Sequence, residues 1–525
     1  MFIPSRAPQS FIQFLFRQKP SRWALASSLG LLLFALGCGS NGTNVPGPYS
    51  KSSLNGTYVV RLSGNDAFLD NANNEQDESY TETLILKADG AGHLTGVEDF
   101  NSSRFGFSGG NTFSGTYDVA HDGNGSMTIN FTGGSSGQIN LSITLASTTK
   151  FYVAEADAFI NFSANATGVG VLQSTSTSAL TAAPTGTFIM RAHLTSLSEA
   201  HVGALASASG TTVTGTLDVL RSGQLLPQLT LTNASFSAPD SNGTGTLTYT
   251  ENGTVTTAYR YYIVDANTFW LMESDTGLLG TGTAEKQATG ALSLAGNFAF
   301  GSSGDTATTG GVRSVGVFSA SGGSITAGTL DSVQDNVSTL NQPFTGNYTE
   351  GANGRVTVSL VPTGGAAIMI PEVFWMVSNS RAYFLIDTNT KVEDGTLDMQ
   401  TQNTFAATDF KSQFGYAMVM DGYLASTGFL TRIGTLYPDG NGNLALNEEV
   451  NSLVFPPPPT LPGSVNDPPT LNGTYQVGSN GRITGVINTL SSNLVGYMVS
   501  PGQVYWLQND TGAEISGQLT LQASP

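Results

Sequence analysis

The chain has 525 residues, a formal charge of −18 at neutral pH and a charged fraction of only 11%. An acidic surface repels phosphate backbones and anionic lipid headgroups, so the balance of charge excludes nucleic acids and charged membrane surfaces as partners. Cys38 is the only cysteine, and no disulfide can form within the chain. The length is ample for several domains, whose stability must come from packed apolar surface.

The N-terminal segment has the charge pattern of a secretory signal. Four basic residues precede an apolar run from Trp23 to Leu36, and no acidic residue occurs before Cys38. The run has about fourteen residues, short of the roughly twenty that a membrane-spanning helix needs. We therefore predict that residues 1–37 are a signal peptide, whose removal takes the formal charge to −22.

The end of this segment, Ala35-Leu36-Gly37-Cys38, resembles the lipobox of bacterial lipoprotein precursors. The resemblance implies that a lipid such as palmitate is attached to Cys38, which becomes the mature N-terminus. In that family, Gly39 after the acylated cysteine is compatible with sorting to the outer membrane. We expect an exported protein anchored by its lipid at the bacterial outer membrane or cell surface, with residues 38–53 as a flexible tether. A secretory signal cut nearby without lipidation is the alternative.

Three short markers recur in step along the rest of the chain, about 110–130 residues apart. They are Asn-Gly pairs at Asn124, Asn242, Asn353 and Asn480, the pattern Gly-x-x-x-x-Gln ending at Gln173, Gln287, Gln400 and Gln522, and opening glycines at Gly56, Gly186, Gly296 and Gly415. The period predicts four tandem units at residues 54–173, 184–287, 292–400 and 411–525. A Pro-rich insertion at residues 455–469 is predicted to project from the fourth unit as a stiff polyproline II arm.

Within a unit, apolar and polar residues alternate, which is typical of half-buried antiparallel strands. Residues 127–131, 139–145 and 356–360 show this period of two. The Asn-Gly pairs predict type I′ hairpin turns between neighbouring strands, and so a meander. Aromatic pairs recur later in each unit and are expected to cap one end of a core: Phe151-Tyr152, Phe269-Trp270, Tyr383-Phe384 and Tyr505-Trp506.

About eight strand-like runs fit in each unit, which predicts an all-β chain of four antiparallel meanders, each a small barrel or sandwich. An eight-bladed β-propeller has the same strand count and is the alternative. Linkers rich in Ser, Thr and Ala, such as residues 174–184, favour separate units. The segments 54–58 and 92–96 resemble the opening strands of avidin-like and lipocalin-like barrels, and the units resemble tandem repeats of uncharacterised lipoproteins from environmental bacteria. These resemblances imply a barrel architecture, and they give no indication of an activity.

Candidate catalytic residues are few. Residues 106–110 and 133–137 match the nucleophile-elbow pattern Gly-x-Ser-x-Gly, but neither follows a strand and opens a helix, as that motif requires. The four histidines have no metal-ligand spacing and are expected to be solvated or in turns: His93, His121, His193 and His201. No catalytic residue is predicted.

An acidic residue recurs once in each unit, at Asp99, Asp218, Asp331 and Glu448. Glu98-Asp99 and Glu448-Glu449 are pairs, and neighbours on a strand point to opposite faces, so they cannot act as the facing carboxylates of a glycosidase. A structural role is expected, with multivalent binding as the alternative. A further acidic loop has enough oxygen ligands for Ca²⁺ but lacks the EF-hand pattern, so we expect solvation of its side chains: Asp66, Asp70, Glu75 and Asp77.

The sequence therefore predicts a non-enzymatic surface lipoprotein that acts in adhesion, glycan contact or envelope structure, where linked weak sites gain avidity. The expected partners are the membrane, through the lipid on Cys38, and glycans or surface proteins. No cofactor other than this lipid is expected. One alternative is small-ligand binding inside the barrels, which requires hollow interiors. Another is hydrolysis of an extracellular polymer.

Overall fold

The computed structural model describes residues 47–524 apart from short gaps at 70–74, 133–136, 160–161, 196–197, 209–210, 276, 307–309, 364–369, 388–390, 425–427, 454–462, 467–469 and 489. The predicted signal peptide, Cys38 and the first part of the predicted tether lie outside this range. Among the described residues, no helix has the length and apolarity needed to cross a membrane.

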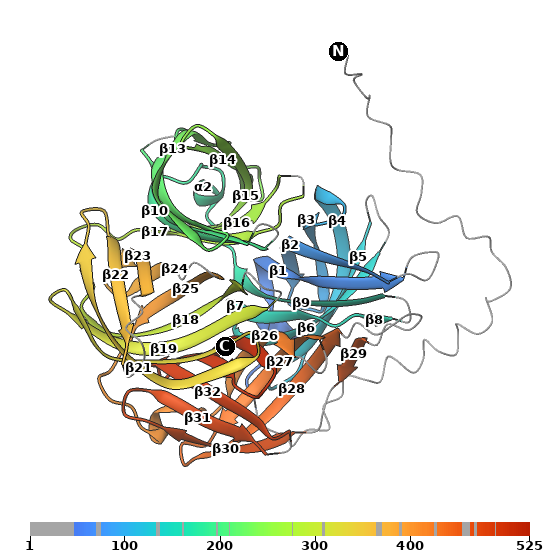
Figure 1. Cartoon of the computed structure of the whole chain (residues 1–525). Helices are drawn as coiled ribbons and strands as arrows, with labels where there is room; N and C mark the ends of the chain where they lie inside the picture. Colours follow the sequence, from blue (N-terminus) through green and yellow to red (C-terminus); the bar gives the residue numbers. More distant parts are fainter. Residues whose placement is uncertain are drawn as a thin grey trace. The chain divides into compact units, whose positions relative to one another are not determined.

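The described chain forms four closed, eight-stranded antiparallel β-barrels in tandem (Figure 1). This confirms the predicted all-β fold of four meander units, and the alternative of an eight-bladed propeller is wrong. In barrel 1, β1 also pairs with β9, which closes the sheet, and short β8 extends the edge of β9. The strands of barrel 1 are β1 (Asn55–Leu69), β2 (Glu75–Asp89), β3 (His93–Ser102), β4 (Gly106–Val119), β5 (Asn124–Phe131), β6 (Gln138–Ser147), β7 (Lys150–Glu155), β8 (Ala158–Phe159) and β9 (Phe162–Leu172).

Barrels 2 and 3 close in the same way, by pairing of their first and last strands. Barrel 2 consists of β10 (Gly186–Leu194), β11 (Glu199–Ser207), β12 (Thr214–Arg221), β13 (Gln224–Phe236), β14 (Thr244–Glu251), β15 (Val255–Asp265), β16 (Thr268–Glu273) and β17 (Thr281–Lys286). Barrel 3 consists of β18 (Gly296–Thr306), β19 (Gly311–Ser321), β20 (Ser324–Gln334), β21 (Val337–Glu350), β22 (Arg355–Pro362), β23 (Ile370–Ser378), β24 (Arg381–Asp387) and β25 (Lys391–Met399).

Barrel 4 repeats the plan, with the extra strand β29 paired to the outer end of β28. Its strands are β26 (Tyr416–Leu424), β27 (Gly428–Pro438), β28 (Asn443–Leu453), β29 (Gly463–Asn466), β30 (Leu471–Val477), β31 (Arg482–Ile487), β32 (Ser492–Ser500), β33 (Gln503–Gln508) and β34 (Ala513–Leu521). β29 lies within the predicted Pro-rich arm. This part of the insertion is therefore paired into the sheet, and the consecutive prolines lie outside the described residues.

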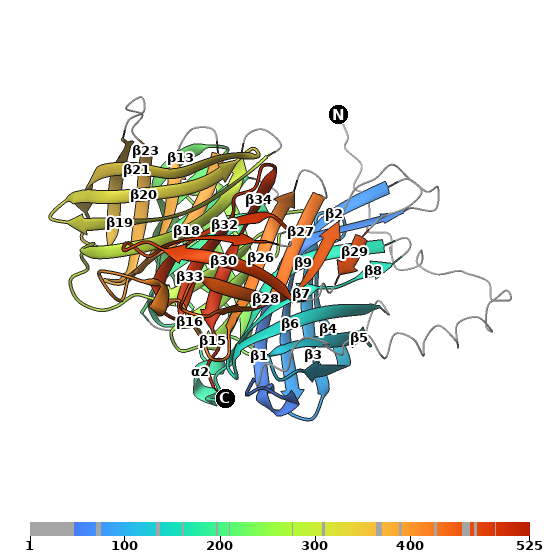
Figure 2. The ribbon, with the colours of Figure 1, turned by 90° about the horizontal axis from the view of Figure 1, so that it is seen from below.

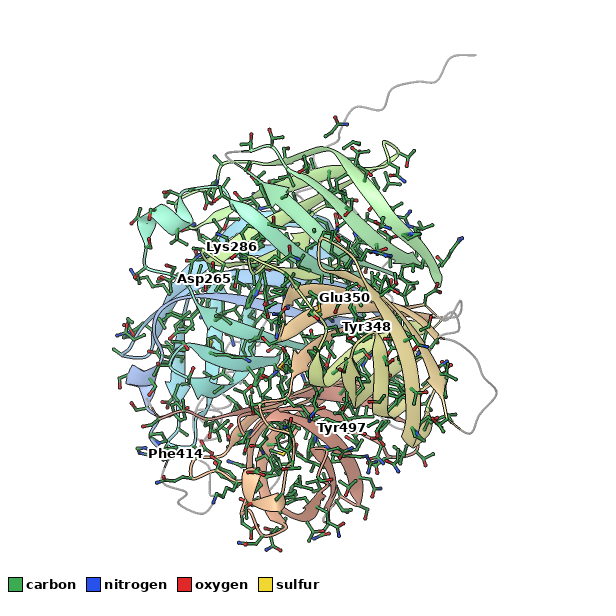
Figure 3. The ribbon with its side chains drawn as sticks, turned by 90° about the vertical axis from the view of Figure 1, so that its left-hand side faces the viewer. Asp265, Lys286, Tyr348, Glu350, Phe414 and Tyr497 are labelled. Atoms are coloured by element: carbon green, nitrogen blue, oxygen red, sulfur yellow. The ribbon has the colours of Figure 1, made fainter. Side chains whose placement is uncertain are left out.

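A short segment before the first strand packs into the core of each barrel. The 3-10 helices η2 (Lys51–Ser53) and η4 (Ala407–Asp409) precede barrels 1 and 4, and α2 (Thr177–Leu180) lies within the ring of barrel 2 strands in Figure 1. A tyrosine hydroxyl donates a hydrogen bond to the backbone carbonyl of this segment in three barrels, from Tyr117 to Leu54 at 2.7 Å, Tyr348 to Leu294 at 2.6 Å and Tyr475 to Phe410 at 2.8 Å. Glu350, beside Tyr348 in Figure 3, accepts the Leu294 backbone N–H at 2.6 Å.

The recurring aromatic pairs do not cap one end of a core as expected. Successive side chains of a strand point to opposite faces, so each pair sends one ring inward and one outward. Phe151, Phe269, Phe384 and Trp506 belong to the four interior cores. Their neighbours Tyr152, Trp270, Tyr383 and Tyr505 lie in apolar clusters between barrels.

The predicted type I′ turns are also wrong in their details. A type I′ turn requires positive φ at both central residues, yet Asn242, Asn353 and Asn480 do not have it. In each of these hairpins the glycine alone is left-handed, and its N–H bonds to the carbonyl three residues earlier, as in Gly243 to Asp240 at 3.1 Å. In unit 1 this position is Gly123, with φ of 85°, so Asn124-Gly125 already lies in β5. The hairpin connections themselves are confirmed.

The outward apolar faces pack barrel against barrel, so the described residues from Gly47 onward form one compact unit rather than separate ones. The early strands of one barrel contact the late strands of the next. Val59 packs with Trp270, Val202 with Trp375 and Val317 with Tyr505 in the three interfaces between successive barrels. A fourth interface joins Tyr152 and Ala154 of barrel 1 to Ala417 and Ile433 of barrel 4. Figure 2 shows β26 and β27 beside β7 and β9.

The recurring glutamine connects each barrel to the following one. Gln173 Nε2 donates to the carbonyls of Asn242 and Ile263, both at 2.8 Å. Gln287 and Gln400 make the same pair of bonds to barrels 3 and 4. Gln522 donates at 2.8 Å to the carbonyls of Asp122 and Leu145, which belong to barrel 1. The repeat marker thus closes the four barrels into a ring.

The end of the predicted tether takes part in this closure. Tyr49 is buried, and its hydroxyl donates to the carbonyl oxygens of Ala146 at 3.1 Å and Ala523 at 2.6 Å. The residues from 47 onward are therefore packed against barrel 1, contrary to the expectation of a flexible segment up to residue 53.

We predict that Gln522→Ala lowers the free energy of unfolding by about 1–3 kcal/mol, because two carbonyls at the closing interface lose their donor. The midpoint of urea unfolding, followed by tryptophan fluorescence, measures this loss. Gln224→Ala, at an exposed position on β13, is the matched control and should leave the midpoint unchanged. Equal midpoints for Gln522→Ala and the wild type would contradict a stabilising closure.

Candidate functional site

The recurring acidic residues Asp99, Asp218 and Asp331 lie at the interfaces between barrels. Asp99 on β3 accepts hydrogen bonds from the Tyr262 hydroxyl at 2.7 Å and from Arg260 Nε at 3.3 Å, both on β15 of barrel 2. It also accepts the backbone N–H of Gly110 at 2.8 Å, next to a β-bulge between β3 and β4. The carboxylate of Asp99 therefore stabilises a β-bulge in barrel 1 and also a contact with barrel 2.

The same arrangement recurs twice with stronger pairing. Asp218 is fully buried and forms a two-point ion pair with Arg355 of barrel 3, both bonds at 2.7 Å, and it accepts Trp375 Nε1 at 2.6 Å. Asp331 pairs with Arg482 of barrel 4 at 2.6 and 2.7 Å and accepts the hydroxyl of Tyr497, which is labelled in Figure 3. These contacts hold neighbouring barrels in a fixed register.

Glu448 does not lie at the equivalent position. Its side chain faces the interior of barrel 4, where it pairs with Arg432 at 2.7 and 2.9 Å. The outward residue is the adjacent Glu449, which accepts a hydrogen bond from the Ser142 hydroxyl of barrel 1. The alternation of a strand explains the difference, because a shift of one residue exchanges the two faces.

A cavity of about 730 Å³ lies between the barrels. Most of its walls come from the first hairpins of the four barrels, and we call it the four-hairpin cavity. The residues that line it are mostly small and polar: Ser63, Asn65, Ser79 and Asn165 from barrel 1, Thr195 and Ser198 from barrel 2, Asp305, Thr306, Arg313 and Asn336 from barrel 3, and Asp421, Tyr423, Phe429, Thr431 and Glu514 from barrel 4.

Two features of this cavity are suited to ligand binding. Tyr423 is 38% exposed, and its ring packs edge-on against Phe429 with the centroids 5.9 Å apart. Arg313 donates through Nη1 to the carbonyls of Gly304 and Val312, and its buried Nε has no hydrogen-bond partner in the described part of the chain. Together they offer an aromatic surface and an unused donor.

A smaller cavity of about 180 Å³ shares Arg313 and Asp421 with the four-hairpin cavity. Glu514 of barrel 4 stabilises the wall between barrels 3 and 4, where it accepts the backbone N–H groups of Gly311 at 2.9 Å and Asn336 at 2.5 Å. The cavity wall is therefore built from hydrogen-bonded hairpins.

A charged network borders the cavity at the contact of barrels 2 and 3. His193 Nδ1 lies 2.6 Å from Asp394, and its Nε2 lies 3.4 Å from Asp305. Burial acts to lower the pKa of His193, but these two carboxylates raise it to about 9. Arg191 also pairs with Asp394. At neutral pH this network is fully charged.

The prediction for the histidines is half right. His93 and His121 are exposed, and His93 pairs with Asp89 at 2.8 Å. His201 is wrongly predicted, because it is only 1% exposed and lies inside barrel 2, and His193 is partly buried in its ion network. The sequence did not signal this, because the partners of His193 and most partners of His201 are far apart in sequence.

The other sequence candidates are not brought together in a site. Residues 106–110 lie within β4, with Ser108 exposed, and not between a strand and a helix; residues 133–136 are outside the described part. In the acidic loop, the described part of the chain does not include Asp70 or the side chains of Glu75 and Asp77. Asp66 lies opposite Glu78 in the β1–β2 ladder. The expected solvation of this loop, with calcium binding as the weaker alternative, stays a prediction.

Buried carboxyls accumulate inside barrel 1. Burial raises the pKa values of Glu82 and Glu155 well above the usual range. Burial also raises the pKa of Glu98 to about 7, although a hydrogen bond from Asn111 acts to lower it. In barrel 3, burial raises the pKa of Glu372 to about 8. Such groups are neutral in the folded protein at a pH where they would ionise in water.

No protein-family model matches the chain, and no curated protein matches it. Among the solved structures that align with it are the following two. One is intact Ap-TbpB with its N and C lobes, at 9% identity and a TM-score of 0.18 over 68% of this chain and 79% of that chain. The other is a mutant of the vaccine antigen transferrin binding protein B from Haemophilus parasuis Hp5, at 8% identity and a TM-score of 0.20 over 66% and 77%. Scores this low do not establish a common fold.

We predict that the folded state is more stable near pH 5 than near pH 8.5. The pKa of Glu98 is about 7 in the folded protein and near 4.5 in the unfolded chain. Because the folded state holds the proton more tightly, the stabilising contribution of Glu98 is full below about pH 4.5. This contribution is lost as the pH rises from about 4.5 to about 7. The loss is on the order of 3 kcal/mol at most, at 1.36 kcal/mol per pKa unit. Urea unfolding at both pH values measures it.

Glu98→Gln removes this titration, so the difference in stability between the two pH values should shrink. A wild type that is equally or more stable at pH 8.5, or a variant with the same difference as the wild type, would show that Glu98 is not held neutral by its surroundings.

Proposed function

We propose that this chain is an exported, lipid-anchored binding protein without enzymatic activity, and that its ligand is a neutral oligosaccharide held in the four-hairpin cavity. The single observation that carries the proposal is the cavity itself, to which the first hairpins of all four barrels contribute. Its volume of about 730 Å³ falls within the range typical of small-molecule sites.

The chemistry of the lining supports a sugar. A sugar ring offers C–H faces to an aromatic side chain and hydroxyls to polar groups around its edge. Tyr423 and Phe429 supply the aromatic surface, while hydroxyl and amide side chains such as Ser63, Asn65 and Asn165 supply donors and acceptors. Arg313 adds an unused donor.

Charge supports a neutral rather than an anionic glycan. Three carboxylates line the cavity, on Asp305, Asp421 and Glu514, against the single cation Arg313. The chain as a whole is strongly acidic, with a formal charge of −18. An acidic polysaccharide would be repelled both at long range and within the site.

The filled barrels argue against a ligand inside any one of them. Each interior holds a continuous apolar core, with side chains as large as Trp506, Tyr58 and Phe318 packed together. A hydrolase has no support from the elbow motif at residues 106–110, because Ser108 lies within a strand. Both alternatives are therefore less favoured than binding between the barrels.

A glycan array probed with the mature chain tests the proposal. Neutral oligosaccharides should bind, and Tyr423→Ala should weaken the best of them at least tenfold, which corresponds to about 1.4 kcal/mol. The matched control is Phe105→Ala, because Phe105 is 67% exposed and does not line the cavity. Failure of the wild type to bind any glycan, or an equal loss in the two variants, would overturn the proposal.

The lipid anchor has its own test, in which Cys38 is replaced by alanine and cells are fractionated. Cys38→Ala should move the protein from the membrane fraction to the soluble exported fraction, because acyl chains are the attachment we propose for this acidic chain. Retention of the variant in the membrane fraction would contradict lipid anchoring.

A further inference from the structure

We propose that barrel 2 contains a zinc site formed by Glu199, His201 and Glu251. The three side chains are buried, with exposures of 2%, 1% and 2%. One ligand atom from each lies within 4.8 Å of the other two. This inference concerns a different part of the molecule from the four-hairpin cavity and does not rest on the proposed function.

The strand pattern brings these residues together. On β11, Ala200 and Val202 face outward into the contact with barrel 3, so Glu199 and His201 face inward. On β14, Tyr249 belongs to the interior core, and Glu251 lies two residues further along the same face. Glu199 pairs with Leu194 at the far end of β10, so the group occupies one end of the barrel interior.

The distances are close to those of a metal site. His201 Nε2 lies 2.5 Å from Glu199 Oε1 and 3.8 Å from Glu251 Oε1. Ligands about 2.0–2.2 Å from a tetrahedral zinc ion lie roughly 3.3 Å from one another. The two distances from His201 lie on either side of this value, and the third pair of ligand atoms lies within 4.8 Å, so small side-chain shifts create the site.

An unsatisfied oxygen supplies the second argument. Glu251 Oε1 has no hydrogen-bond partner in the described part of the chain, although it is buried and directed at His201. A buried carboxylate oxygen without a partner is costly. In barrel 4, Arg432 occupies the strand position that corresponds to His201, and both oxygens of Glu448 are paired there. Barrel 4 therefore places a cation of its own chain at the strand position that His201 occupies in barrel 2, where one carboxylate oxygen is left without a partner.

The surrounding groups would hold the ligands in place. His201 Nδ1 lies 3.0 Å from the Tyr249 hydroxyl, a contact that orients the ring with Nε2 toward the carboxylates. Arg221 donates to both oxygens of Glu199, at 2.5 and 2.7 Å, and to Glu251 Oε2 at 3.1 Å, which leaves Glu251 Oε1 free. One arginine against two carboxylates leaves room for a further cation.

The ligand set favours zinc over harder ions. Imidazole nitrogen suits Zn²⁺ and other late first-row metals, whereas Ca²⁺ and Mg²⁺ take oxygen ligands almost exclusively. Three protein ligands leave one tetrahedral position for water. Ser198, the residue before Glu199, lines the four-hairpin cavity, so the site lies one residue from that cavity.

The test is a zinc titration of the full mature chain after treatment with a chelator, with bound metal measured by mass spectrometry after gel filtration. One zinc ion per chain is expected, together with a higher melting temperature on saturation. Cobalt(II) in its place should give the intense visible absorption of tetrahedral coordination. A wild type without stoichiometric zinc would overturn the proposal, and the group would then be an ion network only.

Two variants identify the ligands. His201→Gln and Glu251→Gln should each weaken zinc binding at least tenfold, with circular dichroism used to establish that each variant is folded. His93→Gln is the matched control, because His93 is an exposed histidine beside an aspartate and should leave the affinity unchanged. Wild-type affinity in folded His201→Gln, or loss of binding in His93→Gln, would place the metal elsewhere and overturn the assignment.

Discussion

Each barrel carries an apolar strip on its outer surface, and the need to cover that strip determines how the molecule is assembled. The first strand of a barrel is apolar on both faces, as in Val59 and Val60 or Ile189 and Met190. One face fills the interior and the other is covered by late strands of the next barrel. A contact of this head-to-tail kind leaves an open end unless the series closes on itself. Here the fourth barrel meets the first, and the series closes.

The polar contacts follow from this packing. The glutamine at the end of each unit and the aspartates on the third strands lie beside the apolar clusters, where buried carbonyls and strand bulges need donors and acceptors. Their recurrence along the sequence reflects a recurring interface. The four-hairpin cavity is another result, because ring closure brings the first hairpins of all four barrels together.

Much of the fold was predictable from the sequence because a period of two and a repeat of fixed length are local signals. They gave the strands, the four units and their hairpin connections. They did not distinguish the inside of a barrel from its outside, because both faces of several strands are apolar. For that reason Glu448 was grouped with Asp99, Asp218 and Asp331, although the adjacent Glu449 is the residue that faces barrel 1. The same ambiguity hid the roles of the aromatic pairs.

The candidate sites were beyond sequence reasoning for a different reason. The cavity residues are small, polar and spread over four hairpins, so no single stretch contains a motif. Glu199 lies two residues before His201, but Tyr249 and Glu251 are on another strand, so the sequence gave no recognisable ligand pattern. In each case the ring or the barrel, and not the local chain, creates the chemistry.

Closure of the ring by Gln522 also sets an order of events during biosynthesis. The outer strip of barrel 1 around Tyr152 is covered by β26 and β27, strands made only after three quarters of the chain. Until those strands have been made, barrel 1 exposes an apolar surface of the kind that aggregates or recruits chaperones. The final contacts, from Gln522 to Leu145 and from Tyr49 to Ala523, can form only when nearly the whole chain has been delivered. A chain truncated near its C-terminus would therefore be recognisable to quality control by its first barrel rather than by its last.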